Sequence, residues 1–228
     1  MTVENTQKER YVSHMAKTLI SISKTDIRGT AVGVLFIAFF GTLWAYAGIM
    51  GLQGWGSPWV LIASLAIGIA LFASGGLLII TSRELPNQIP YTAGKRRKNI
   101  TGWFNTIFLA EGLAIVIAIA VCNAAGHAEL IPLVIALIVG VHFFPLAYLF
   151  QVKIYYYTGA LLCLLPVITW IFVPIHITLM EQQINAYMSI VGFGSSLILW
   201  GTSLVICLIG RRLVRLASNE KKNVAVYS

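Results

Sequence analysis

Two residues with chemical potential, one carboxyl and one imidazole, stand inside long apolar runs. Glu111 lies in FLAEGLAIV and His142 lies in GVHFFPLAYLF. Burial disfavours the charged form of each group alone, whereas two neighbouring groups share a proton as a hydrogen-bonded or ionic pair. Ionisable side chains inside a membrane are rare and mark binding sites, ion paths or proton relays. We therefore take Glu111 and His142 as the candidate polar centre.

Both residues are expected at one depth of a bilayer. Glu111 follows the start of its run by roughly ten residues, or about 15 Å of helix, and His142 follows the outer end of the next run by about 18 Å. Each is then near the middle of a hydrocarbon core about 30 Å thick. The two runs follow one another, so their helices are antiparallel neighbours. The alternative is that each side chain bonds a hydroxyl on another helix and only fixes packing.

Further residues complete the candidate site. Asn123 and Tyr148 are the other candidate ligand-binding residues, and Pro145 and Pro166 are expected to kink their helices. Pro145 has no N–H to donate to the carbonyl of Val141, which leaves that acceptor free beside His142. Enzyme motifs such as H-E-x-x-H, G-x-S-x-G and a Gly-rich phosphate loop are absent. The three cysteines are isolated, and we expect neither a metal nor a cofactor.

The composition indicates the elements that hold these residues. Hydrophobic residues make up 58% of the 228-residue chain and charged residues only 11%, compared with about 25% charged in a soluble domain. A spanning helix needs about 20 apolar residues. Six runs qualify, which predicts an all-α, polytopic six-helix transmembrane bundle: Thr30–Gly51, Pro58–Ile80, Gly102–Ala124, Leu130–Gln151, Tyr156–Ile175 and Met188–Gly210.

The positive charges predict the orientation of this bundle. All 16 Lys and Arg residues lie before the first run, between the second and third, between the fourth and fifth, or after the sixth. Short basic loops stay cytoplasmic, so both termini are expected inside, in a bacterial plasma (inner) membrane. The net charge of +8 then forms a cytoplasmic collar that faces anionic lipid headgroups. Nucleic acid is not an expected partner, and the oligomeric state is left open.

Three parts of the chain follow from these boundaries. Residues 1–28 are a cytoplasmic N-terminal segment, in which apolar residues at helical spacing indicate a helix on the membrane surface; a solvated tail is the alternative. Residues 29–212 form the transmembrane domain. Residues 213–228 are expected to be a short cytoplasmic tail.

Three segments carry a family resemblance. The stretches EGLAIVIAIAVCNAAG, LIVGVHFFPLAYLF and YYYTGALL resemble a family of small bacterial six-helix integral membrane proteins of unknown function. The most specific part is HFFPLAYLF, together with the preceding Glu and Asn. The resemblance implies a bacterial plasma membrane and six helices, and it implies no activity or substrate.

The function predicted from these features is binding or transport of a small or lipid-like molecule in a cavity centred on Glu111 and His142. One alternative is an intramembrane enzyme that acts on a lipid or isoprenoid with this pair as acid and base. It lacks a nucleophile and a metal cluster, so we favour a protein that is not an enzyme. Another alternative is a non-catalytic assembly subunit. A cavity open to water favours transport, a cavity open sideways favours lipid binding, and full packing favours a structural role.

Overall fold

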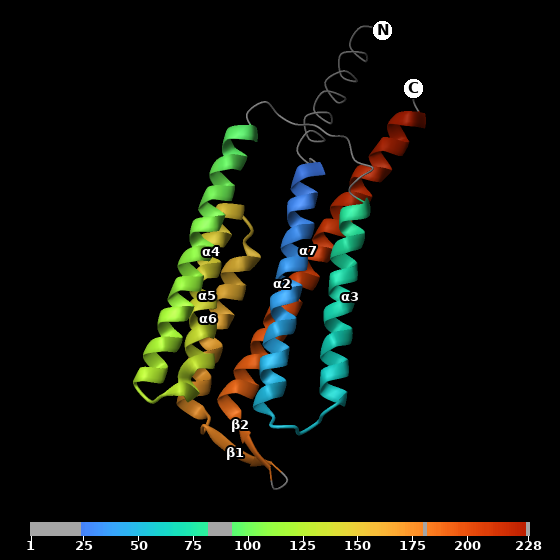
Figure 1. Ribbon diagram of the computed structural model, residues 1–228. Coiled ribbons are helices and arrows are strands. Elements are labelled where there is room, and N and C mark those ends of the chain that lie inside the picture. Colours follow the sequence, from blue (N-terminus) through green and yellow to red (C-terminus); the bar gives the residue numbers. More distant parts are fainter. Residues whose placement is uncertain (1–23, 82–92, 180–181, 227–228) are drawn as a thin grey trace, which may run out of the picture.

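A computed structural model describes residues 24–81, 93–179 and 182–226. Six helices of this part of the chain are long and apolar enough to cross a membrane (Figure 1). The predicted membrane bundle is thereby confirmed as six apolar helices. They are α2 (Lys24–Gly51), α3 (Trp59–Thr81), α4 (Ala93–Ala124), α5 (Ile131–Phe150), α6 (Ile154–Phe172) and α7 (Ala186–Val226), with a short 3-10 turn η2 (Ala128–Leu130) before α5.

The helices form two groups that meet along α7. Helices α2, α3 and α7 pack against one another, and α4, α5 and α6 form the second group. Helix α7 contacts α6 and α5 and so joins the groups, whereas α4 packs mainly on α5. Among the six apolar spans, α4 is the least buried. The first turn of α2 and the last turn of α7 lie at the same end of the bundle (Figure 1).

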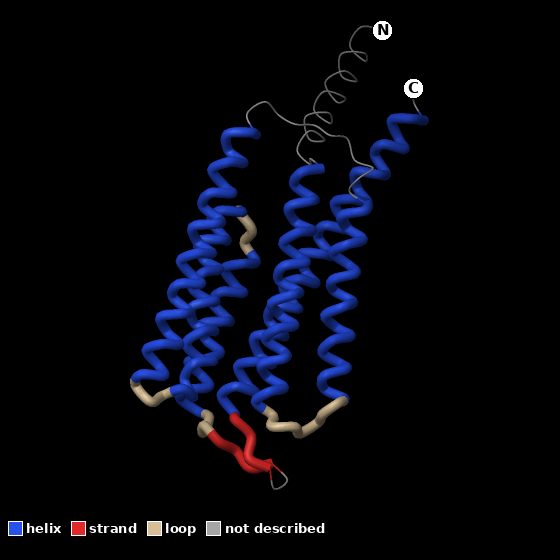
Figure 2. The backbone as a smooth tube through the Cα atoms, in the orientation of Figure 1, coloured by secondary structure: helices blue, strands red, loops and turns tan. Residues whose placement is uncertain are grey.

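A small β-hairpin between α6 and α7 departs from the all-α expectation. Strands β1 (His176–Leu179) and β2 (Gln182–Asn185) pair antiparallel at the end away from the chain termini (Figure 2). The predicted fifth span ran to Ile175, but α6 ends at Phe172. The cause is Pro174, since a residue before proline avoids the helical region, and Val173 is extended with φ −114° and ψ 132°.

The structure describes part of the chain outside the membrane spans. Helix α7 runs without a break to Val226, so the expected tail at 213–228 is helical as far as that residue. The expected surface helix in residues 1–28 lies outside the described residues up to residue 23, and the rest of that segment begins α2. The basic run Lys95–Lys98 belongs to the first turns of α4 rather than to a loop.

Close contact between α2 and α7 depends on glycine. A Cβ on Gly192 would lie 2.5 Å from the Cα of Gly48, and a Cβ on Gly51 would lie 2.6 Å from the backbone N of Ser189. Small residues allow backbones to approach in this way, which increases van der Waals contact in lipid. Gly192 therefore lies on the packing face between α2 and α7, whereas a Cβ on Gly29 would meet nothing within 4 Å.

We expect Gly192→Ala to lower the stability of the bundle, because the new methyl group would overlap the backbone of Gly48. Overpacking of this kind costs about 1–3 kcal/mol. Gly201→Ala is the matched control on the same helix, since a Cβ there meets nothing within 4 Å. Thermal unfolding in detergent measures both variants. Equal melting temperatures for the two variants would show that the α2–α7 contact is looser than described.

Candidate functional site

The α4–α5 hairpin brings the two predicted residues together. Residues 125–130 connect the helices, with Gly126 at φ +74° and the 3-10 turn η2. A connection this short makes the helices antiparallel neighbours. Their contact is confirmed, and it places Glu111 of α4 level with His142 of α5.

Glu111 and His142 form a buried ion pair. The Oε1 of Glu111 lies 3.0 Å from the Nδ1 of His142, and their side chains are 9% and 11% exposed. The two atoms are at ion-pair distance, but Nδ1 lacks the angles of a hydrogen bond. The predicted juxtaposition is thus present in the structure.

Aromatic rings surround the imidazole. The ring of Phe108 lies 5.9 Å from that of His142 in an edge-to-face arrangement, and the ring of Phe143 lies 5.1 Å away. Such ring contacts add about 0.5–1.5 kcal/mol each beyond the burial of their area. They fix the plane of the imidazole and keep water from one side of the pair.

The second nitrogen of His142, Nε2, is buried and makes no hydrogen bond among the described residues. A buried polar atom left unpaired costs about 1–3 kcal/mol. The imidazole therefore has one nitrogen at ion-pair distance from a carboxyl oxygen and one without a hydrogen bond in the described part of the chain. This arrangement suits ligand binding or proton transfer.

A shallow apolar groove lies between α2 and α4, next to the pair but not lined by Glu111 or His142. Its volume is about 440 Å³, and it is more open than enclosed. Phe36 of α2 faces Phe104 and Phe108 of α4, with ring centroids 6.4 and 5.1 Å apart. Asn105 is the polar residue in its lining, and Gly112 follows Glu111 directly. Phe108 both lines the groove and contacts His142.

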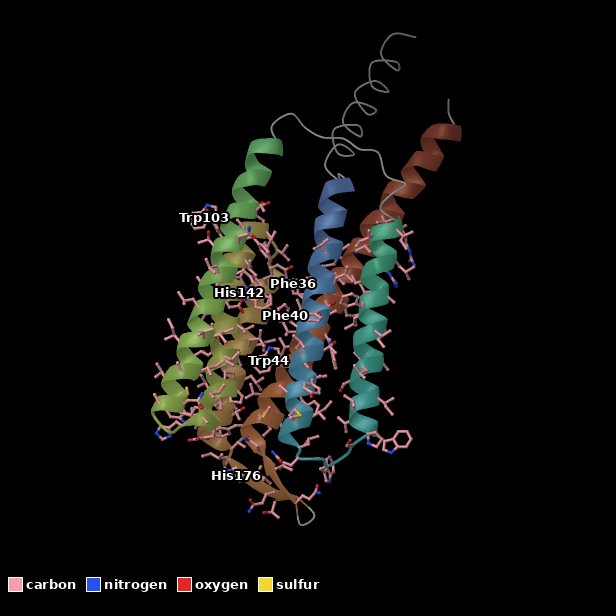
Figure 3. All side chains as sticks on the ribbon, viewed as in Figure 1. Phe36, Phe40, Trp44, Trp103, His142 and His176 are labelled. Carbon is pink, nitrogen blue, oxygen red and sulfur yellow. The ribbon has the colours of Figure 1, made fainter. Side chains whose placement is uncertain are left out.

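Figure 3 shows how α2 faces the pair. Phe36 and Phe40 lie on the side of α2 toward α4 and α5, at the level of His142 (Figure 3). The ring of Phe40 is 4.8 Å from Phe36 and 6.2 Å from Phe108. Sequence reasoning did not single out these phenylalanines. Their four-residue spacings, Phe36 with Phe40 and Phe104 with Phe108, were a usable signal, but phenylalanine in an apolar span is too common to stand out.

Asn123 and Tyr148 are not brought to the pair. Asn123 donates to the carbonyl of Ile119 on its own helix at 2.8 Å and lies about 18 Å along α4 from Glu111. The side of α5 that carries Tyr148 faces outward, and Tyr148 is 79% exposed. Pro145 and Pro166 lie inside α5 and α6, and both helices continue through them.

Hydroxyl groups serve mainly as connections between and within helices. Thr158 of α6 and Thr202 of α7 are 2.7 Å apart, and Ser203 donates to the carbonyl of Val34 on α2 at 3.1 Å. Thr202 and Ser203 thus connect α7 to α6 and to α2. Thr169 and Ser196 instead donate within their own helices, to Leu165 and Phe193.

A second carboxylate–imidazole contact lies in the connection between α4 and α5. The Nδ1 of His127 is 3.1 Å from the Oε1 of Glu129, and the His127 side chain is 62% exposed. The described part of the chain contains no group of three His, Cys, Asp or Glu side chains arranged to hold a metal ion. Exposure and screening make such a contact weak, so it is a useful control for the buried pair.

The six long apolar helices indicate a multi-pass helical membrane protein. No protein-family model, no curated protein and no solved structure matches it. The resemblance to small bacterial membrane proteins therefore stays a prediction, and the function has to be argued from the site.

Coupling between Glu111 and His142 is measurable in a double-mutant cycle. We expect Glu111→Leu and His142→Phe each to destabilise the bundle, because each leaves the other polar group buried without its partner. The double variant should be more stable than the sum of the two losses implies. A coupling of about 1–2 kcal/mol is the upper range for polar contacts between membrane helices.

Unfolding in SDS–detergent mixtures gives the four free energies of the cycle. Strictly additive losses would mean that the two side chains do not interact.

Proposed function

We propose that the protein binds a small or lipid-like molecule in the groove between α2 and α4 and recognises a polar group of that molecule through Glu111 and His142. The observation that carries this proposal is the buried Nε2 of His142, which has no partner among the described residues and adjoins an apolar groove through Phe108. A bound hydroxyl, carbonyl or acid would supply the missing hydrogen bond.

The shape of the groove favours lipid binding over an aqueous channel. Phe36, Leu109 and Leu113 line the groove and are also exposed on the side of the bundle. They lie within apolar spans, so acyl chains rather than water would surround the opening. Movement of a ligand between the groove and the bilayer requires no water-filled path.

A second candidate function is acid–base chemistry on a lipid or isoprenoid substrate. It is favoured by one specific feature, a carboxylate at Nδ1 with Nε2 unoccupied. In that arrangement the carboxyl group of Glu111 would orient the imidazole through Nδ1, while Nε2 would exchange a proton with the substrate. The chain would then supply an acid–base catalyst but no nucleophile, so binding or transport remains the better supported function.

We further propose that the protein lies in a bacterial plasma membrane with both termini in the cytoplasm. The basic residues support this orientation: Lys24, Arg28, Lys95–Lys98, Arg211, Arg212 and Arg215 all lie at the end of the bundle where α2 begins. Glu129 and the β-hairpin lie at the other end.

In a variant lacking the native cysteines, a thiol at Gln183 in β2 should react with a membrane-impermeant maleimide in intact bacteria. A thiol at Lys221 in α7 should react only after the membrane is opened, because basic segments stay inside. Mass tagging on gels reads out both positions. The reverse pattern would invert the proposed orientation.

Glu111→Gln should remove the ligand that purifies with the native protein, because an amide neither carries charge nor accepts a proton as the carboxylate does. Mass spectrometry of small molecules and lipids extracted from both proteins measures the difference. The control is His127→Ala, which removes the exposed carboxylate–imidazole contact and should leave the extracted molecules unchanged. If the native protein and Glu111→Gln yield the same molecules, the buried pair does not bind the ligand.

A further inference from the structure

We infer that the ligand is an anionic lipid from the leaflet that contains the basic residues, with one acyl chain in the groove between α2 and α4. This inference rests on the proposed function and names the chemical class of its ligand. It draws on three features of α4: where the groove begins, how long it is, and which charges precede it.

The groove begins at the level of the membrane surface. Its lining on α4 starts at Phe104 and Asn105, next to Trp103, which is 63% exposed and lies toward the basic end of α4 (Figure 3). Trp side chains prefer the headgroup level, where one edge of the ring meets water. Asn105 therefore stands where the ester and headgroup region of a lipid meets its hydrocarbon chain.

The length of the groove matches a single leaflet. Its lining on α4 runs from Phe104 to Leu113, which is about 14 Å of helix. Half of a hydrocarbon core about 30 Å thick is about 15 Å. One chain from the nearer leaflet would fill the groove, and its far part would reach Gly112, beside Glu111 and His142.

The charge of the α4 sequence selects an anionic headgroup. Lys95, Arg96, Arg97 and Lys98 occupy the first turns of α4, roughly 10 Å before Asn105. Each basic residue near a membrane surface attracts anionic lipid, whereas a zwitterionic headgroup gains little. The described part of α4 carries its acidic residue, Glu111, at the opposite end of the groove.

The inner surface of the groove is suited to a hydrocarbon chain. Phe36, Phe104 and Phe108 form its walls, and a Cβ on Gly112 would meet nothing within 4 Å. Aromatic walls with a glycine beside them leave room for methylene groups along the helix.

The test uses the full chain in nanodiscs that contain equal parts of phosphatidylglycerol and phosphatidylcholine, followed by native mass spectrometry of the released protein. We expect one phosphatidylglycerol molecule to be retained. Gly112→Leu should reduce its retention about tenfold, a change readily measured, because the leucine fills the groove. Gly76→Leu on α3 is the matched control, since a Cβ there also meets nothing within 4 Å.

Replacing Lys95–Lys98 with glutamine tests the contribution of the headgroup independently of that of the acyl chain. The preference for phosphatidylglycerol over phosphatidylcholine should fall at least about fivefold, while a lipid chain is still retained. Leucine is a better helix former than glycine, so helix propensity gives no reason for Gly112→Leu to misfold. The melting temperatures of all the variants check this directly.

Three outcomes distinguish the two proposals. Phosphatidylglycerol retained by Gly76→Leu and lost in Gly112→Leu supports the inference. A neutral lipid or isoprenoid that is lost in both Glu111→Gln and Gly112→Leu overturns the anionic class but keeps the proposed function. No bound molecule that responds to either change overturns both.

Discussion

Hydrocarbon offers no hydrogen bonds, so each polar group within the bundle must find its partner inside the protein. The arrangement of α2, α6 and α7 follows from this constraint, with Thr158 bound to Thr202 and Ser203 bound to the carbonyl of Val34. Glu111 and His142 meet the same requirement by pairing an acidic side chain with a basic one, with Oε1 and Nδ1 3.0 Å apart. Among the described residues, five buried side-chain atoms have no hydrogen-bond partner: both ring nitrogens of His142, the hydroxyl oxygens of Ser189 and Ser195, and the Nε1 of Trp200. The Nε2 of His142 differs from the serine and tryptophan atoms because its ring contacts both an acidic side chain and a phenylalanine of the groove.

Some pairs of helices pack with their backbones in contact, whereas others are held apart by large side chains. A ligand fits only between helices that are held apart. Glycine brings α2 against α7 and α5 against α6, where a Cβ on Gly140 would lie 3.0 Å from the carbonyl O of Gly159. Helix α4 has no such contact with α2, and aromatic rings 5.1 to 6.4 Å apart span the space between them. The glycine contacts hold α2 against α7 and α5 against α6. The groove lies between α4 and α2, where phenylalanine side chains separate the two helices.

Much of the fold was predictable because the signals were strong. The lengths of the apolar runs predicted the ends of the spans to within a few residues. The positions of the basic segments between the runs supported the count of six. The contact between Glu111 and His142 could be predicted because both residues lie near the middle of their apolar runs and a short connection joins the two helices. Asn123 and Tyr148 lie away from the pair, and this could not be predicted because depth along a helix does not reveal which side of the helix a residue occupies; that side depends on tertiary packing. The hairpin at His176–Asn185 was missed because its strands have only four residues each.

Helix α7 continues from Arg212 to Val226 beyond its apolar span, a length of about 21 Å. An unbroken helix is stiff, so this rod and the intramembrane part of α7 tilt as one body. The apolar span of α7, Ala186–Arg212, is about 39 Å long, so the extension from Arg212 to Val226 is the shorter part of the helix. Because α7 also joins the two helix groups, a tilt of the extension would be shared with the helix that both groups contact.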